Sequence, residues 1–149
     1  MLGAEAERVR RALSLGRAEA VVCAGWEEGI AASLRCGFAA AAGAAWVVVL
    51  LADEPRLPGA AIARVVAAAR SAPAPTQAVR ARWADGRPGH PVALRGALAP
   101  SIEALRGDSG ARAVLDRADV LEVGCADLGP VADVDTPRQL GDLRRPAAP

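Results

Sequence analysis

The sequence predicts an α/β domain with a mainly parallel sheet, and three features of its 149 residues lead to this prediction. Short apolar segments of strand length alternate with longer segments whose apolar residues recur every three or four positions, as on one face of a helix. The valine-rich segment 46–51 has no polar alternation, so it needs cover on both faces. Strands that alternate with helices form parallel sheets through right-handed crossovers, which place ligands at the carboxyl ends of the strands.

The first third of the chain is expected to contain a helix, a strand and a second helix. The first helix is predicted over Ala4–Leu15, because its apolar residues share one face and a glycine follows. The unbroken apolar run within Glu19–Ala24 predicts a strand buried on both faces. The second helix is predicted over Gly29–Ala42. Its narrow apolar stripe comprises Ile30, Leu34 and Phe38.

The middle of the chain contains the strongest strand signal. Trp46–Leu51 is predicted to be a central strand, and Pro58–Arg70 is predicted to be a helix. Alternation of apolar and basic residues predicts a half-exposed strand over Gln77–Trp83. A turn at Asp85-Gly86 leads to a short strand over Gly89–Leu94, so we expect a hairpin at an edge of the sheet. The inward side chains of the helix are expected to be Ile62, Val65 and Val66.

The last third repeats the alternation. Helices are predicted over Ala97–Leu105 and from Arg112 to Arg117, and a strand over Val120–Val123. The last helix has an N-cap candidate, a proline at its first position and two leucines for its buried face. These residues are Thr136, Pro137, Leu140 and Leu143. One domain is expected over residues 1–145, followed by a disordered tail at 146–149.

Charge and hydropathy exclude several classes of function. Eighteen basic and 17 acidic residues give a net charge of +1, so no global field favours nucleic acid or an anionic membrane. The longest apolar run, 39–52, is shorter than the roughly 20 residues that cross a bilayer. The first eleven residues carry charges where a signal peptide would be apolar, which predicts a cytoplasmic protein.

Cysteine and lysine usage narrow the chemistry further. Cys23, Cys36 and Cys125 are odd in number and lack a C-x-x-C pair, so we expect buried, inert thiols and neither a disulfide framework nor a zinc site. All 18 basic residues are arginine. Chemistry that requires a lysine therefore cannot run on this sequence alone.

Two groups of carboxylates are candidates for a metal site. Asp53 follows the most apolar strand, so it lies at the ligand-binding edge of the predicted sheet, where Mg²⁺ carried by substrate phosphates would need an oxygen ligand. It could equally cap the turn before Pro55. Asp133 and Asp135 share one face of an extended segment, but they also precede a helix, whose dipole favours acidic residues. The two interpretations are compatible.

Two further residues have a structural and a functional interpretation. His90 is the only histidine and lies in a turn, where it could line a substrate, support the structure or act as a general base. Arg112 ends a glycine-rich loop and could bind a phosphate or carboxylate, or simply be exposed or paired with Asp108. The sequence has no G-x-S-x-G, G-x-G-x-x-G or G-x-x-x-x-G-K-[ST] motif, so hydrolase elbows and the common phosphate loops are absent from it.

Five segments, taken in order, resemble the MobA-like NTP transferase family, particularly its molybdenum-cofactor cytidylyltransferases. Trp26–Gly37 is similar to the family's W-x-x-G-M-x-x-S-L-x-x-G, and Leu51–Pro55 is similar to its L-x-D-Q-P. Gly89–Val92, Gly107–Arg112 and Asp133–Pro137 resemble its G-x-P-V, G-D-x-G-A-R and D-I-D-T-P elements. Each segment is weak by itself, and the order of all five is the specific signal.

The resemblance implies a three-layer fold of the nucleotide-diphospho-sugar transferase type, with helices on both faces of the sheet and the first strand missing from this sequence. It implies transfer of CMP from CTP, or GMP from GTP, to the phosphate of a molybdopterin-type cofactor. By resemblance, the catalytic and Mg²⁺-binding residues are Asp53 and Asp135. The nucleotide-binding residues would be Gly29, Ser33, Leu34, Ala52 and Pro55. The substrate-binding residues would be His90, Asp108 and Arg112.

The sequence departs from the family in two ways. It lacks the first strand with the glycine-rich phosphate loop and lysine, and Glu54 replaces the usual Gln. One backbone donor to a charged transition state can be worth about 3 kcal/mol, so loss of the loop predicts little or no transferase activity. Loss of a central strand would expose apolar strand edges, which predicts either a homodimer or poor solubility.

Two other functions stay open from the sequence. The chain could be a noncatalytic binding or chaperone-like module for a molybdoenzyme, which would be indifferent to nucleotide and metal. It could also be a nucleotide-sugar transferase of related fold, which would use sugar phosphates as acceptors.

Overall fold

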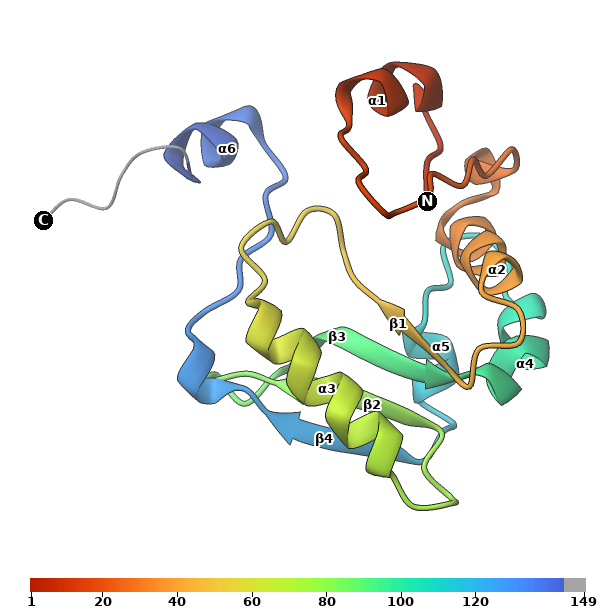
Figure 1. Ribbon diagram of the computed structural model, residues 1–149, viewed down its shortest axis with the longest axis vertical. Helices are drawn as coiled ribbons and strands as arrows, with labels where there is room; N and C mark the ends of the chain where they lie inside the picture. Colours follow the sequence, from red (N-terminus) through yellow and green to blue (C-terminus); the bar gives the residue numbers. More distant parts are fainter. Residues whose placement is uncertain (144–149) are drawn as a thin grey trace, which may run out of the picture. The chain divides into compact units, whose positions relative to one another are not determined.

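The computed structural model describes residues 1–143, and the chain divides into two compact units. The helices and strands can be followed in Figure 1. The predicted tail at 146–149 lies outside the described residues. Unit 1 comprises Met1–Val47, Pro75–Ala78 and Leu94–Val120. Unit 2 comprises Val48–Ala74, Val79–Ala93 and the chain from Leu121 onwards.

Four strands form one sheet, which confirms the predicted α/β class. The strand order is β1-β3-β2-β4. β2 and β3 form a hairpin, closed by a 3.0 Å hydrogen bond from the Trp83 N–H to the Arg87 carbonyl. β3 points opposite to the other three strands, which share one direction (Figure 1). The strands are β1 (Trp46–Val49), β2 (Ala78–Arg82), β3 (Pro88–Arg95) and β4 (Val120–Gly124).

The strand order corrects two expectations. β1, expected at the centre, lies at an edge, and the β2–β3 hairpin, expected at an edge, occupies the centre. Burial agrees with this order, because Val79, Ala81 and Ala93 in the hairpin are completely buried while all four residues of β1 are half-buried. A run of valines predicts that the two faces of a strand are covered. It does not predict whether the strand has a neighbour on one edge or on both.

Unit 1 contains four helices, and α2 packs against α4. The predicted stripe of α2 is only partly correct, because Phe38 is buried but Ile30 is 58% exposed. The buried face instead carries Ala31 and Ala32, whose small side chains allow a close helix–helix approach. The helices are α1 (Ala6–Ala12), α2 (Ile30–Ala40), α4 (Ala99–Glu103) and α5 (Arg112–Leu115).

The predicted strand at residues 19–24 does not form. A single bridge joins Leu2 to Val22, and Val22 is 51% exposed, so this segment lacks the neighbours that a buried strand needs. The expectation of three free thiols is also wrong, because Cys23 and Cys36 form a disulfide with a Cα–Cα distance of 6.0 Å. Their spacing of 13 residues carries no sequence signature of a disulfide. Cys125 is free and buried, as expected.

Two α-helices belong to unit 2. α3 (Gly59–Ser71) buries Ala61, Val65 and Ala69. α6 (Pro137–Leu143) has the predicted cap, because the Gln139 N–H donates to Thr136 Oγ1 at 3.2 Å. We expected the apolar face of α6 to be buried, but Leu140 is 42% exposed. No helix within residues 1–143 is long and apolar enough to cross a membrane.

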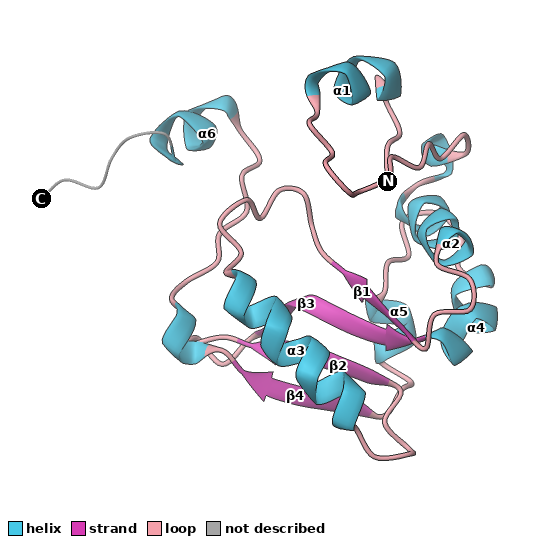
Figure 2. Cartoon of the chain, viewed as in Figure 1, coloured by secondary structure: helices cyan, strands magenta, loops and turns pink. Residues whose placement is uncertain are grey.

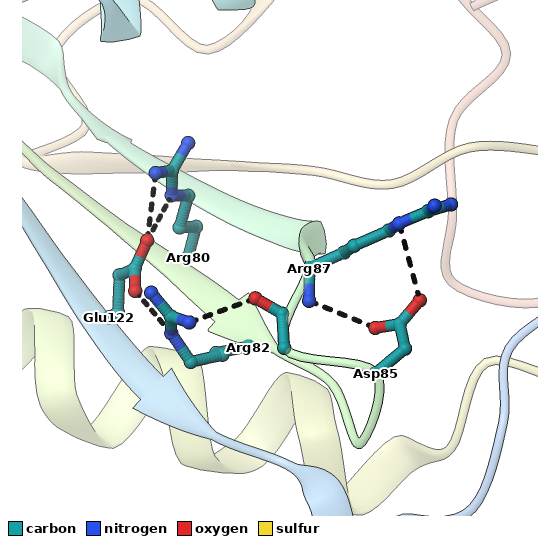
Figure 3. A network of polar contacts seen from close by, with 6 residues as sticks. Arg80, Arg82, Asp85, Arg87 and Glu122 are labelled. Atoms are coloured by element: carbon teal, nitrogen blue, oxygen red, sulfur yellow. Dashed lines mark hydrogen bonds and ion pairs between the residues drawn. The ribbon is translucent and has the colours of Figure 1, made fainter.

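An ion-pair network ties β2 to β4 in unit 2 (Figure 3). Glu122 Oε1 accepts from Arg80 Nη2 at 2.8 Å, and Glu122 Oε2 accepts from Arg82 Nε at 2.5 Å. Arg82 also donates to the Gly86 carbonyl in the hairpin turn at 2.8 Å. The polar residues that alternate along β2 therefore bind the neighbouring strand, which explains a pattern that looks half-exposed in the sequence.

Candidate functional site

Two loops of unit 2 meet beside Asp53. The first follows β1 and the second precedes α6, and neither contains a helix or strand (Figure 2). The Val134 N–H donates to the Asp53 carbonyl at 2.8 Å, which holds the segment from Asp133 to Asp135 against the turn. Asp53, Asp133 and Asp135 are all exposed. The structure thus brings together the two acidic segments that the sequence singles out 80 residues apart.

Glu54 occupies the interior of this meeting point. Its side chain is 10% exposed, and its Oε1 lies 3.8 Å from His90 Nδ1. Its Oε2 is buried and has no hydrogen-bond partner within residues 1–143. Burial raises the pKa of Glu54 above its usual value, and the neighbouring charges of Asp133 and Asp53 raise it further. The site therefore holds a carboxyl group whose charge nothing in the described part of the chain neutralises well.

His90 does not supply that missing positive charge. Burial lowers the pKa of His90, and the nearby Asp53 and Asp133 only partly oppose this shift. The 3.8 Å contact with Glu54 is therefore a weak one, because burial raises the pKa of Glu54 and lowers the pKa of His90. The indole N–H of Trp83 donates to the His90 carbonyl at 3.2 Å, which fixes the backbone here. A Cβ on Gly89 would lie 2.9 Å from the same indole nitrogen, so this position requires glycine.

The donor set fits a divalent cation that brings its own ligands. Asp53 and Asp133 offer exposed carboxylates, and within residues 1–143 the buried Glu54 Oε2 has no hydrogen-bond partner. Within residues 1–143, however, no group of three or more His, Cys, Asp or Glu side chains could hold a metal ion alone. Mg²⁺ is commonly bound by one or two carboxylates, with water and substrate phosphates completing its octahedron.

Asp135 has a second role in the geometry. Its backbone N–H donates to Gln139 Oε1 at 3.0 Å, and the same oxygen accepts from the Thr136 hydroxyl at 2.8 Å. Asp135 therefore takes part in the start of α6, as the helix-cap interpretation expects. Asp133 is the residue of this segment whose charge acts on Glu54 and His90. Sequence reasoning weighed Asp133 but assigned the metal to Asp53 and Asp135.

The predicted residues of unit 1 form a separate group. Gly29 has a φ of 103°, and a Cβ there would lie 2.6 Å from both Asp108 Oδ1 and the Gly107 carbonyl. The Ala31 N–H donates to the Gly107 carbonyl at 3.0 Å, which attaches the first turn of α2 to this loop. Ser33 and Leu34 are half-buried on α2, and Arg112 is exposed at the start of α5.

The predicted site residues therefore fall into two sets. Unit 2 holds the acidic turn, in which Ala52 and Pro55 are exposed on either side of Asp53 and Glu54, together with His90 and Asp135. The unit 1 set is Gly29, Ser33, Leu34, Asp108 and Arg112. Sequence reasoning missed the burial of Glu54. The available signal was the acidic residue standing where the family pattern has Gln.

Comparison with known proteins assigns the chain to a family. Residues 1–122 match the model of the MobA-like NTP transferase domain. The nicotine blue oxidoreductase of Paenarthrobacter nicotinovorans is 30% identical over 145 residues, which cover 94% of this chain and 71% of that protein.

Solved structures are similar over nearly the whole chain. The crystal structure of Rv0371c from Mycobacterium tuberculosis H37Rv has a TM-score of 0.76 and 31% identity, over 95% of this chain and 72% of that one. A manganese complex of Rv0371c has a TM-score of 0.75 and 28% identity, over 95% and 73% of the two chains. Because the matched domain spans most of the chain and the fold agrees, this chain belongs to the MobA-like NTP transferase family.

Proposed function

We propose that this chain binds a nucleoside triphosphate together with a divalent cation at the acidic turn of unit 2, and that its reaction is nucleotidyl transfer. The observation that carries this proposal is the partnerless, buried oxygen of Glu54 between the carboxylates of Asp53 and Asp133. A fold rarely keeps such a group unless a ligand or a reaction uses it. Membership in the MobA-like NTP transferase family supports the same chemistry.

The finer proposal concerns the substrates. CTP is the proposed donor, with GTP as the other candidate, and the acceptor is the terminal phosphate of a molybdopterin-type cofactor. An acceptor oxygen forms a bond to the α-phosphorus of the nucleotide, and the bond to pyrophosphate breaks. Mg²⁺ would be held by Asp53, with Asp133 or Asp135, and it would supply charge neutralisation during the in-line displacement.

The remaining side chains bind and orient the two substrates. Gly29, Ser33, Leu34, Ala52 and Pro55 are proposed for the nucleotide, and His90, Asp108 and Arg112 for the acceptor. Glu54 replaces a glutamine whose amide would donate hydrogen bonds. Because the pKa of Glu54 is raised, its protonated form persists to higher pH, and in that form it donates an O–H bond as an amide would donate N–H.

Calorimetric titration of Mg²⁺-CTP into the chain tests this proposal. We expect saturable binding that Asp53→Asn weakens by about tenfold, because one charged oxygen ligand is lost. Asp85→Asn is the matched control, since Asp85 is an exposed aspartate in the hairpin turn of unit 2 that pairs with Arg87. Equal binding by the wild type and Asp53→Asn would refute the proposed site. Indifference to both nucleotide and metal would favour the noncatalytic binding module.

The name of one relative favours a second candidate function. A protein 30% identical to this chain is an oxidoreductase, so a redox reaction on the same fold is the alternative. NADH or NADPH, added with and without CTP, separates the two. Binding of a reduced nicotinamide dinucleotide with no binding of CTP would favour the oxidoreductase.

The proposal of nucleotidyl transfer also includes a cytoplasmic location, a homodimer and a molybdoenzyme as the protein partner.

A further inference from the structure

Unit 1 contains a cavity that the acidic turn does not use. Its volume is about 540 Å³, which lies in the range of small-molecule sites. Its wall is built from the residue before β2, from Leu98 and α4, and from the chain between α4 and the start of β4. The amino ends of β2 and β4 therefore border it, whereas Asp53 follows the carboxyl end of β1.

Two guanidinium groups give this cavity a positive lining. Arg106 and Arg117 are both exposed, and neither has a carboxylate partner in the described part of the chain. Arg106 Nη1 donates to the carbonyls of Glu103 at 2.6 Å and Leu105 at 2.8 Å, which fixes the guanidinium at the end of α4. The other N–H groups of Arg106 stay available. Among the described residues, no Asp or Glu lines the cavity.

Neutral donors accompany the two charges. The hydroxyls of Ser101 and Ser109 line the same cavity, and Gln77 stands at its edge before β2. The Gln77 Oε1 accepts a hydrogen bond from the Asp119 N–H at 3.3 Å, so the amide group is turned and its N–H atoms can donate. The rest of the wall is apolar, and its largest apolar side chains are Leu98, Leu105 and Val114. Such a wall can cover the organic part of a ligand.

The loop between α4 and α5 presents different residues to different neighbours. Asp108 lies against Gly29, as the 2.6 Å approach to a Cβ there shows. Arg106 and Ser109, on either side of it in sequence, line the cavity, whereas Asp108 and Arg112 do not. The cavity is therefore distinct from the residues that the family pattern assigns to the acceptor substrate.

We propose that this cavity binds a phosphate monoester of a small apolar molecule. The dianionic phosphate is held by Arg106 and Arg117, because two guanidinium charges match its charge and their planar donors match its oxygens. The hydroxyls of Ser101 and Ser109 donate to the remaining phosphate oxygens. The organic part lies along Leu98 and Val114 and buries apolar surface there.

Phenyl phosphate is the probe, and calorimetry on the full chain in buffer with EDTA is the measurement. We expect one saturable site that Arg117→Gln weakens by about tenfold, since a charge-assisted hydrogen bond is lost. Arg117 makes no side-chain hydrogen bond within residues 1–143, so this variant removes charge without removing a structural contact. Arg11→Gln is the matched control, because it makes the same change of charge on exposed α1.

Further titrations, with another ligand and with other variants, identify the class of ligand and the place where it binds. Inorganic phosphate should bind more weakly than phenyl phosphate, and equal affinities would overturn the apolar wall as part of the site. Ala113→Phe should abolish binding by filling the cavity without a change of charge. Asp53→Asn should bind phenyl phosphate as the wild type does, which separates this proposal from the nucleotide site. No saturation at about 1 mM, or equal losses in Arg117→Gln and Arg11→Gln, would overturn the proposal.

Discussion

Two glutamates of unit 2 have opposite surroundings. Glu122 on β4 accepts hydrogen bonds from two arginines of β2, Arg82 and Arg80, and these bonds lower its pKa (Figure 3). Glu54 is buried beside two other carboxylates and a histidine that favours its neutral form, and its pKa is raised. Arginines therefore neutralise the charge of Glu122 on the sheet, whereas no cationic side chain neutralises Glu54 in the described part of the turn after β1.

The difference separates a charge with a structural role, that of Glu122, from a carboxyl group that the proposed function assigns to a ligand site. Arg80 and Arg82 alternate with buried residues along β2, so their pairing with Glu122 helps to hold two strands in register. Glu54 contributes no such contact, and a buried acceptor without a partner costs about 1–3 kcal/mol. A cation bound by the neighbouring aspartates would remove part of that cost. If the proposed function is correct, the acidic turn is the region where stability is given up for ligand binding.

The largest expected effect is a difference in ligand affinity between variants of the two aspartates beside Val134. Asp133→Asn and Asp135→Asn should differ in Mg²⁺-CTP affinity, and we expect about tenfold weaker binding for Asp133→Asn because Asp133 is the charge that acts on Glu54. Asp135→Asn should change the affinity less, since the Asp135 N–H bond to Gln139 is kept. Calorimetry of both variants measures this. The reverse order would make Asp135 the ligand, as the family resemblance implies.

The second effect is a pair of opposite changes in stability. Glu54→Gln should raise the free energy of unfolding by about 1 kcal/mol, because it removes a buried carboxyl group from two like charges. Glu122→Gln should lower it by up to about 1 kcal/mol, since the ion pairs are partly exposed and screened. Urea unfolding in EDTA measures both. Destabilisation by Glu54→Gln would mean that the turn is not strained by its charges.

The smallest effect is the dependence of these differences on pH. The pKa of Glu122 is lowered, so its stabilisation is complete above 4.5 and is lost as the pH falls through the lowered value. The pKa of Asp127 is lowered to about 2 by Arg64, so its contribution is lost below 3.8. The loss in the free energy of unfolding caused by Glu122→Gln should therefore become smaller as the pH falls. A deficit that stays constant from pH 7 to about pH 3 would contradict the network.

The same rule gives the opposite direction for Glu54. Its pKa is raised above 4.5, so the wild type loses stability as the pH rises from 4.5 through the raised value. The gain in the free energy of unfolding from Glu54→Gln should therefore increase over that pH interval and then become constant. Acid titrations of the wild type and this variant, followed by circular dichroism in urea, provide the comparison. An advantage that is largest in acid would contradict the raised pKa.

The alternation of elements and several of their ends could be predicted from the sequence. The cap at Thr136 was predictable because serine and threonine before a proline mark a helix start, and the structure has the bond from the Gln139 N–H to its hydroxyl. The place of Asp53 in the turn after β1 could be expected from the rule that ligands lie at strand ends. These are local or topological rules, which a single sequence contains.

Other features depend on long-range packing. The valines of β1 predict a strand but not its place at the sheet edge. The Cys23–Cys36 disulfide depends on how a loop lies on α2, and no spacing signals it. The burial of Glu54 depends on the approach of His90 and of the loop before α6, both distant in sequence. Tertiary contacts, and not propensity, decide each of these.

Electron paramagnetic resonance of Mn²⁺ tests the central claim most directly. The free ion gives a strong six-line signal that decreases on binding, so titration of the chain into Mn²⁺ with CTP counts bound ions. We predict one ion per chain in the wild type, weaker binding by about tenfold in Asp53→Asn, and unchanged binding in Asp85→Asn. If the Mn²⁺ signal is the same for the wild type and Asp53→Asn, the acidic turn does not hold a cation and the account is wrong.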